Sequence, residues 1–168
     1  NFPLNYPFKK IHLFDTDQEL SNLYPNFPQP ISDKENIYVL NTKGNLISIY
    51  KNNWKIEWKS RVFFDGNSTS NPGSIVSNPK NYKLYAHNGT NEIIGVNKNN
   101  GRIFWRFKNK LPFKGNISIE DNLIVVNDYG NNLISFNNEK LIWKKNLGES
   151  SKSIYSNVRP LIFKNYVI

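Results

Sequence analysis

The stretch NKNNGRIFWRF, Asn97 to Phe107, decides the fold. It places an Asn-Asn-Gly run four residues before Trp105, and a basic residue, Arg106, follows the tryptophan. Asn and Gly adopt a positive backbone φ at the least cost, so the run predicts a tight turn between two strands. The same order returns elsewhere in the chain, which makes the stretch one unit of a repeat.

Three segments share the order strand, Gly-containing turn, strand, Asn-rich turn, and a last strand that ends in Trp and then Lys or Arg. They are Asn36 to Ser60, Tyr82 to Phe107 and Asn122 to Asn146. A further short strand candidate precedes each segment, at QPISDKE, GSIVSNPK and GNISIED. Four short antiparallel strands in about 40–45 residues are typical of a β-propeller blade. A β-sandwich is the rival interpretation, but it does not require this order to return three times.

Three tryptophans, Trp58, Trp105 and Trp143, occupy the same place in their units. We expect each to be a structural residue between adjacent blades, where a ring buries about 150–250 Å². Trp54 stands on a turn, at the position that Gly101 takes in the second unit, and we expect it to be exposed.

Glycines mark the turn between the second and third strands of each unit, at Gly44, Gly89 and Gly130. Hairpin turns need positive φ, and Gly adopts it without steric cost. We therefore expect positive φ at these glycines and their Asn and Asp neighbours, since Asn adopts it at low cost as well.

The ending Gly101-Arg102-Ile103-Phe104-Trp105 resembles the "Gly-Lys-x-x-Trp" ending of the pyrroloquinoline-quinone-type (PQQ-like) propeller repeat. Trp54 and Glu139 replace the glycine in the first and third units, so the match there depends on strand order and the Trp. The resemblance covers about residues 30–168. It implies an all-β fold, a β-propeller of PQQ-like four-stranded antiparallel blades, present in part as about three and a half to four blades.

The units predict five segments along the chain. Residues 1–30 form an N-terminal segment, with an outer strand of a closing blade as one interpretation, and residues 31–60, 61–110 and 111–147 form three blades. Residues 148–168 begin a fourth blade. We expect the sequence to be part of a longer protein, and we expect self-association through open blade faces, because unpaired strand edges recruit other chains.

Composition limits the function. The chain has 168 residues, a formal net charge of +9 and no cysteine, which excludes disulfides, thiolate metal sites and a cysteine nucleophile. The basic residues are mostly single lysines scattered between Asn and Ile residues. An AT-rich genome produces this enrichment without selection for binding, so we expect no nucleic-acid partner. No apolar run approaches the roughly 20 residues that span a bilayer, so membrane attachment would need an anchor outside this sequence.

The candidates for catalysis are few. His12 and His87 are the two histidines, and neither has a Ser or Asp placed for a triad or a second His at metal-ligand spacing. The quinoprotein dehydrogenases among PQQ-like propellers carry an adjacent cysteine pair together with Glu, Asn and Asp ligands. This chain has no cysteine, so we expect no catalytic residue, no metal and no cofactor, and no enzyme activity.

The other branch that the repeat resembles is the BamB type, the periplasmic lipoproteins of the outer-membrane β-barrel assembly machinery. This resemblance implies a non-catalytic scaffold in the periplasm, associated with the outer membrane, whose protein partner is a β-barrel assembly subunit. In that family a loop between two middle blades contacts the barrel-forming subunit. The corresponding segment here is Gly148 to Pro160, where Ile154, Tyr155 and Arg159 are candidate contact residues, because aromatic residues and Arg dominate interface hot spots.

Two alternatives stay open. The first is a ligand-binding propeller for sugar or nucleic acid, supported by Trp54, the Phe63-Phe64 loop and the charge of +9. Steep salt dependence of nucleic-acid binding would favour it. The second is a fragment of a PQQ-dependent dehydrogenase.

Overall fold

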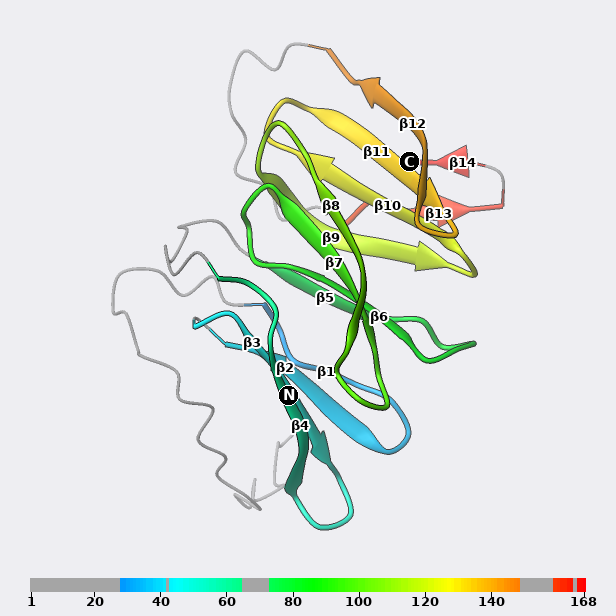
Figure 1. The fold of residues 1–168 in the computed structure, drawn as a ribbon. Helices are drawn as coiled ribbons and strands as arrows, with labels where there is room; N and C mark the ends of the chain where they lie inside the picture. The colour runs from blue at the N-terminus through cyan, green and yellow to red at the C-terminus, as the bar shows by residue number, and fades with distance from the viewer. Residues whose placement is uncertain (1–27, 42, 65–72, 149–158, 165) are drawn as a thin grey trace, which may run out of the picture.

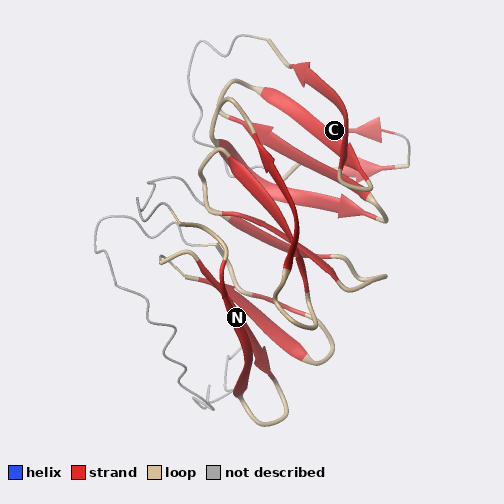
Figure 2. Ribbon diagram, viewed as in Figure 1, coloured by secondary structure: helices blue, strands red, loops and turns tan. Residues whose placement is uncertain are grey.

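The computed structural model describes residues 28–41, 43–64, 73–148, 159–164 and 166–168. All regular structure in these residues is β-strand (Figure 2). Among them, no helix of the length and apolarity needed to cross a bilayer is present. The predicted all-β fold class is therefore confirmed.

Three four-stranded sheets follow one another along the chain, and a two-stranded hairpin follows them (Figure 1). The first sheet contains β1 (Ile31–Ser32), β2 (Asn36–Leu40), β3 (Asn45–Tyr50) and β4 (Lys55–Arg61). The second contains β5 (Ser74–Ser77), β6 (Lys83–His87), β7 (Glu92–Asn97) and β8 (Ile103–Lys108). The third contains β9 (Phe113–Glu120), β10 (Leu123–Asp128), β11 (Asn132–Asn137) and β12 (Lys140–Asn146), and the hairpin pairs β13 (Ile162–Phe163) with β14 (Tyr166–Val167). Within each sheet the strands pair antiparallel in chain order, as in a meander.

The first strands of successive sheets lie next to one another. Strand β5 contacts β1 on one side and β9 on the other, and β9 contacts β13. The last strands, β4, β8 and β12, form the outer edges of the sheets, as Figure 1 shows. The sheets are thus stacked face to face around their innermost strands, as blades are in a propeller.

Two apolar cores hold the three sheets together. One lies between the first and second sheets and includes Tyr38, Leu46, Trp58, Leu84 and Ile94. The other lies between the second and third sheets and includes Tyr85, Ile93, Phe113, Ile124 and Phe136. Successive side chains of a strand point to opposite faces, so the neighbours Leu84 and Tyr85 of β6 belong to different cores. The second sheet is therefore apolar on both faces.

Each sheet carries the same irregularity between its third and fourth strands. Trp58 lies opposite Ser48, Trp105 opposite Gly95, and Trp143 opposite Ser135, and in each case the register shifts at the next residue pair. A bulge at this place increases the twist of the outer strand, which makes that edge a poorer template for another chain.

The turn before each fourth strand needs a left-handed residue. Trp54, Gly101 and Glu139, which the repeat places at the same position, have φ of 58°, 69° and 62°. The glycine of the repeat therefore reflects a requirement for positive φ. The first and third units satisfy this requirement with Trp and Glu in place of Gly. The expectation that Trp54 is exposed is wrong, because the side chain is half-buried. Its turn is closed by a hydrogen bond from Trp54 N to Tyr50 O of 2.8 Å, which keeps the residue near the sheet.

The turns between second and third strands have the expected positive φ. It falls on Gly44 and Gly89, with φ of 76° and 81°. In the third unit it falls on Asn131, the neighbour of Gly130, with φ of 56°. The carboxylate Oδ1 of Asp128 accepts hydrogen bonds from Gly130 N and Asn132 N, and Asn tolerates the left-handed region between them.

Candidate functional site

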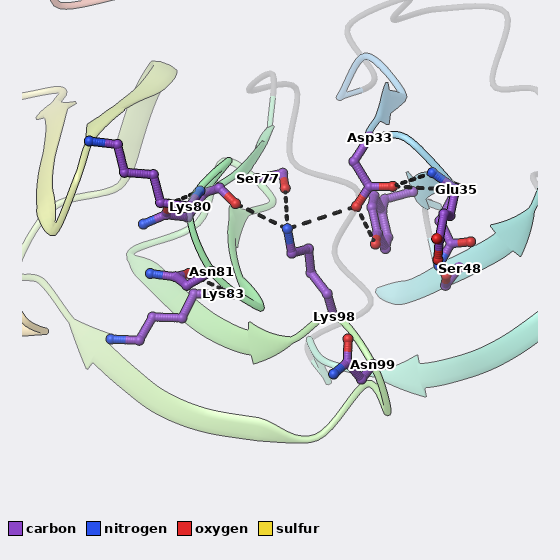
Figure 3. A network of polar contacts seen from close by, with 12 residues as sticks. Asp33, Glu35, Ser48, Ser77, Lys80, Asn81, Lys83, Lys98 and Asn99 are labelled. Atoms are coloured by element: carbon purple, nitrogen blue, oxygen red, sulfur yellow. Dashed lines mark hydrogen bonds and ion pairs between the residues drawn. The ribbon is translucent and has the colours of Figure 1, made fainter.

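A polar cleft of about 600 Å³ lies between the first and second sheets, at the end where β4 begins. Three turns supply its lining: the turn between β1 and β2, the turn between β5 and β6, and the turn between β7 and β8. These turns come together because the sheets stack in register around β1 and β5. Figure 3 shows the network of polar contacts beside this cleft.

Lys98 lies at the centre of this network (Figure 3). Its Nζ donates to Ser77 Oγ at 3.1 Å and to the carbonyl oxygen of Asn78 at 3.0 Å, and it lies 3.8 Å from Asp33 Oδ2. Its backbone is fixed as well, because the Lys98 carbonyl accepts a hydrogen bond of 2.7 Å from Trp58 Nε1. One lysine therefore joins a turn of the second sheet to a carboxylate and a tryptophan of the first.

Asp33 is held ionised by its neighbours. Burial by itself would raise the pKa of this carboxyl, but hydrogen bonds from Asn36 N, the Tyr38 hydroxyl and Glu35 N, together with the charge of Lys98, keep its pKa below the usual value. Burial raises the pKa of Tyr38, and the hydrogen bond to Asp33 raises it further. Tyr38 thus remains a neutral donor and Asp33 a charged acceptor.

A second group of the same kind joins the second and third sheets. Glu139 Oε1 accepts hydrogen bonds from the Tyr85 hydroxyl at 2.5 Å and from Lys83 Nζ at 2.8 Å. Both ionic side chains are largely buried, with 20% of Lys83 and 18% of Glu139 exposed. Burial raises the pKa of Tyr85, and the Glu139 carboxylate raises it further. At both boundaries a tyrosine of the second strand donates to a carboxylate beside a lysine.

Asp128 is buried at the opposite end of the third sheet. Its Oδ2 accepts hydrogen bonds from Asn109 Nδ2 at 2.9 Å and Lys144 Nζ at 3.0 Å. Burial by itself would raise the pKa of Asp128, but the bonds from Asn109, Lys144 and Asn132 keep it below the usual value. This carboxylate therefore fixes the loop after β8 onto the third sheet.

His87 is fully buried between the second and third sheets. Gly89 N donates to its Nδ1 at 3.1 Å, so the proton is on Nε2, which donates to the Gly115 carbonyl at 3.0 Å. Burial lowers the pKa of His87 to about 4, and the Gly115 carbonyl opposes this shift. The imidazole is therefore a neutral structural link between the two sheets.

The carboxylates of these groups are bonded within the stack of sheets. Asp33, Asp128 and Glu139 each accept hydrogen bonds from two or more donors of the chain. In the described part of the chain, no three His, Cys, Asp or Glu side chains gather in a way that could hold a metal ion. The arrangement provides contact surfaces and clefts between blades.

The three predicted tryptophans lie in different surroundings. Trp58 is buried between the first two sheets, and Trp105 is half-buried with its ring edge-on to Phe136 of the third sheet, at 5.2 Å between ring centroids. Trp143 is half-buried and lines an open apolar pocket of about 600 Å³ with Leu123, Leu133 and Tyr166. Their common role as wedges between blades stays a prediction.

Of the predicted contact residues, Arg159 lies in the described part of the chain, whereas Ile154 and Tyr155 lie outside it. Arg159 is exposed, and its Nε donates to Ser118 Oγ at 3.3 Å. It lines a groove of about 300 Å³ along the innermost strands, with Ser32, Ser77 and Asn116. None of the residues that line this groove is Asp, Glu, His or Cys, so the groove lacks the carboxylates on which calcium sites mainly depend.

Sequence reasoning missed the polar links between blades. Lys98 is one of many lysines on Asn-rich turns, and nothing in its spacing shows that its Nζ meets Ser77 and Asp33. Glu139 did carry a signal, since it replaces the glycine of the repeat at a position that needs positive φ. A charged residue at such a position indicates that its side chain is needed.

The comparisons with known proteins agree with this geometry. The family of the outer membrane protein assembly factor BamB matches residues 51–168, more than half of the chain. The structure of BamB from Moraxella catarrhalis is similar, with a TM-score of 0.62 and 14% sequence identity, over 84% of this chain and 45% of that protein. A europium-containing methanol dehydrogenase is also similar, with a TM-score of 0.58 and 13% identity, over 70% of this chain and 24% of that enzyme. No curated protein sequence matches the chain.

These likenesses confirm the predicted fold, a PQQ-like β-propeller present in part as about three to four blades. The chain spans less than half of the length of the BamB structure that it resembles. At 13–14% identity the two solved structures show the fold alone.

Proposed function

The chain belongs to the family of the outer membrane protein assembly factor BamB, and from this premise we propose that it is a non-catalytic β-propeller scaffold for protein–protein interaction. The observation that carries the proposal is the family match over residues 51–168. In this proposal the chain acts in the periplasm at the outer membrane, in the assembly of β-barrel proteins, and needs no cofactor.

The polar contacts between blades support a scaffold. Carboxylates and lysines of the chain join neighbouring blades, as Asp33 does with Lys98 and Glu139 with Lys83. Such links stiffen the stack, and a stiff surface loses less conformational entropy when a partner binds. The tryptophans 58, 105 and 143 contribute to this stiffness as wedges between blades.

The proposed contact segment is the one that contains Ile154, Tyr155 and Arg159. Arg159 is exposed at the innermost strands, and among the described residues its guanidinium bonds to Ser118 through Nε alone. Its fork suits a carboxylate of a protein partner.

The test is binding of the full chain to the barrel-forming subunit of the assembly machinery, measured by biolayer interferometry. We expect the wild type to bind and Arg159→Glu to bind at least about tenfold more weakly, as for an interface hot spot. Arg102→Glu is the matched control, because Arg102 is also exposed and the change in charge is the same. No binding by the wild type, or equal losses for both variants, would contradict the proposal.

A ligand-binding propeller is the second candidate. The observation that favours it is the cleft of about 600 Å³ between the first two sheets, which Tyr82, Asn81 and Asn99 help to line. An exposed tyrosine beside amide side chains is a surface on which a sugar ring can stack. Oligosaccharide binding that Tyr82→Ala abolishes would favour this function over the scaffold.

A further inference from the structure

Phe64 is an exposed aromatic residue on a fixed backbone, at the end of the sheets opposite the polar cleft. Its ring is 64% exposed, whereas Val62 and Phe63 before it are buried. Val62 N and Phe63 N both donate to the Gly44 carbonyl, at 2.9 and 3.1 Å. The strand end that presents Phe64 is therefore anchored to the first sheet, although the ring itself faces solvent.

Two arginines from different sheets lie over this ring. The Cζ atom of Arg61, at the end of β4, is 5.6 Å from the ring centroid, and that of Arg106, on β8, is 5.9 Å from it. Both distances are within the roughly 6 Å at which a cation is attracted to an aromatic face. The ring thus marks the boundary between the first and second blades.

Arg106 is held in place by two hydrogen bonds. Its Nη1 donates to Glu92 Oε2 at 2.8 Å, and its Nη2 donates to the Val62 carbonyl at 3.0 Å. The backbone of Arg61 pairs with Asn45, but its side chain makes no hydrogen bond to another described residue, so the guanidinium fork remains available. Arg61, Phe64 and Arg106 therefore form a surface that is arranged before any partner arrives, which we call the Phe64 surface.

We propose that the Phe64 surface docks a polypeptide segment of a partner protein that carries an acidic side chain next to an apolar one. The carboxylate would pair with the Arg61 fork, which matches it in two parallel hydrogen bonds, and the apolar side chain would cover the Phe64 ring. This inference rests on the proposed scaffold function and names one surface and the chemistry of its partner.

The charges around the ring favour a peptide over nucleic acid or lipid. A phosphate polymer needs several cations along a track. Here one of the two arginines is already paired with the Glu92 carboxylate. That carboxylate would repel phosphates, whereas a peptide with a single acidic group can avoid it.

The experiment is selection of a random twelve-residue peptide library displayed on phage against the full wild-type chain. The enriched peptides are then counter-screened on Phe64→Ala, Arg61→Gln and a control, Phe163→Ala. Phe163, on β13, is 55% exposed and has the Lys164 ammonium over its ring, so its loss removes a comparable aromatic ring from elsewhere. Synthetic copies of the enriched peptides, with Asn and Gln replacing Asp and Glu, test the need for the carboxylate.

We expect enriched peptides with an acidic residue beside an apolar one. Their binding should be at least about tenfold weaker on Phe64→Ala and on Arg61→Gln but unchanged on Phe163→Ala. Peptides without acidic residues, equal binding to all variants, or no enrichment would overturn the proposal. A single-stranded oligonucleotide or anionic vesicles that bind through Arg61 and exclude the peptides would also overturn it. Because the barrel-forming subunit takes no part in this experiment, its failure is distinct from a failure of the proposed function.

Discussion

At the scale of single residues, the fold places polar groups inside the stack and gives each a partner. His87 is one such residue, and its burial favours the neutral imidazole. Its two ring nitrogens are used by Gly89 and Gly115, and burial lowers its pKa to about 4. A proton on Nδ1 would face the N–H of Gly89, so protonation removes one bond and places a charge between two sheets.

This arrangement predicts a loss of stability in mild acid. The unfolded chain binds a proton at His87 below its ordinary pKa of 6.5, whereas the folded chain does so only near 4. The free energy of unfolding that His87 supports is therefore complete above pH 6.5 and falls by about 3 kcal/mol as the pH drops to 4. Asp33 and Asp128 have lowered pKa values, so their contributions are lost at still lower pH.

NMR titration of the His87 ring measures this directly, and urea unfolding at several pH values gives the linked stability. The variant His87→Gln cannot titrate in this range, and its stability should change less between pH 6.5 and 4. A His87 ring that titrates near 6.5 would rule out the proposed burial effect.

At the scale of elements, the turn before each fourth strand decides how one sheet meets the previous one. Gly101 has a positive φ of 69°, and a Cβ built on it would lie 2.6 Å from Trp58 Cε3 and 2.4 Å from Ser60 Oγ. The same turn supplies the Lys98 carbonyl to Trp58 Nε1. The turn of the second sheet therefore packs directly on the tryptophan of the first. Gly suits this position for two reasons: the backbone has a positive φ, and there is no space for a Cβ.

The matched pair Gly101→Ala and Gly148→Ala separates these two grounds. Gly148 also has a positive φ, 98°, but nothing lies within 4 Å of its added Cβ. A left-handed alanine costs about 1–2 kcal/mol at either position. At Gly101 the overpacking against Trp58 adds about 1–3 kcal/mol.

Urea unfolding followed by tryptophan fluorescence should therefore show a loss of about 2–5 kcal/mol for Gly101→Ala and a clearly smaller one for Gly148→Ala. Equal losses would mean that the contact between the turn and Trp58 is not tight.

At the scale of the whole molecule, three meanders become one body through contacts between residues far apart in sequence. Tyr85 and Glu139 are 54 positions apart, yet the Tyr85 hydroxyl donates to Glu139 in the boundary between the second and third sheets. Lys98 and Asp33 perform a similar task between the first and second sheets. Such links couple the unfolding of neighbouring blades, as the contacts between adjacent repeats do in repeat proteins.

A double-mutant cycle with Tyr85→Phe and Glu139→Gln measures this coupling. A hydrogen bond to a largely buried carboxylate predicts an interaction energy of about 1–2 kcal/mol. Tyr38→Phe combined with Glu139→Gln is the control, because Tyr38 belongs to the other boundary, and these two changes should add. Additive effects for Tyr85 and Glu139 would show that the bond does not link the sheets.

Much of the fold could be predicted from the sequence, since the order of strands, turns and tryptophans repeats and each strand shows its own apolar pattern. The candidate site could be predicted in small part. The sequence indicates a binding role for the Phe63-Phe64 loop. It does not indicate that Arg106, from β8 of the next sheet, lies over the Phe64 ring. In the third unit the residue with positive φ is Asn131 and not Gly130, because the Asp128 side chain accepts hydrogen bonds from Gly130 N and Asn132 N.

The amino-acid sequence by itself determined the all-β class, the four-stranded unit and the family, because hydrophobic alternation and turn residues act over a few positions of the chain. The tertiary structure alone decided which side chains face each other across blades: Lys98 with Asp33, Glu139 with Tyr85, and two arginines with Phe64. These pairings depend on how the sheets stack around their innermost strands, and a stack brings together residues whose separation in sequence carries no local signal.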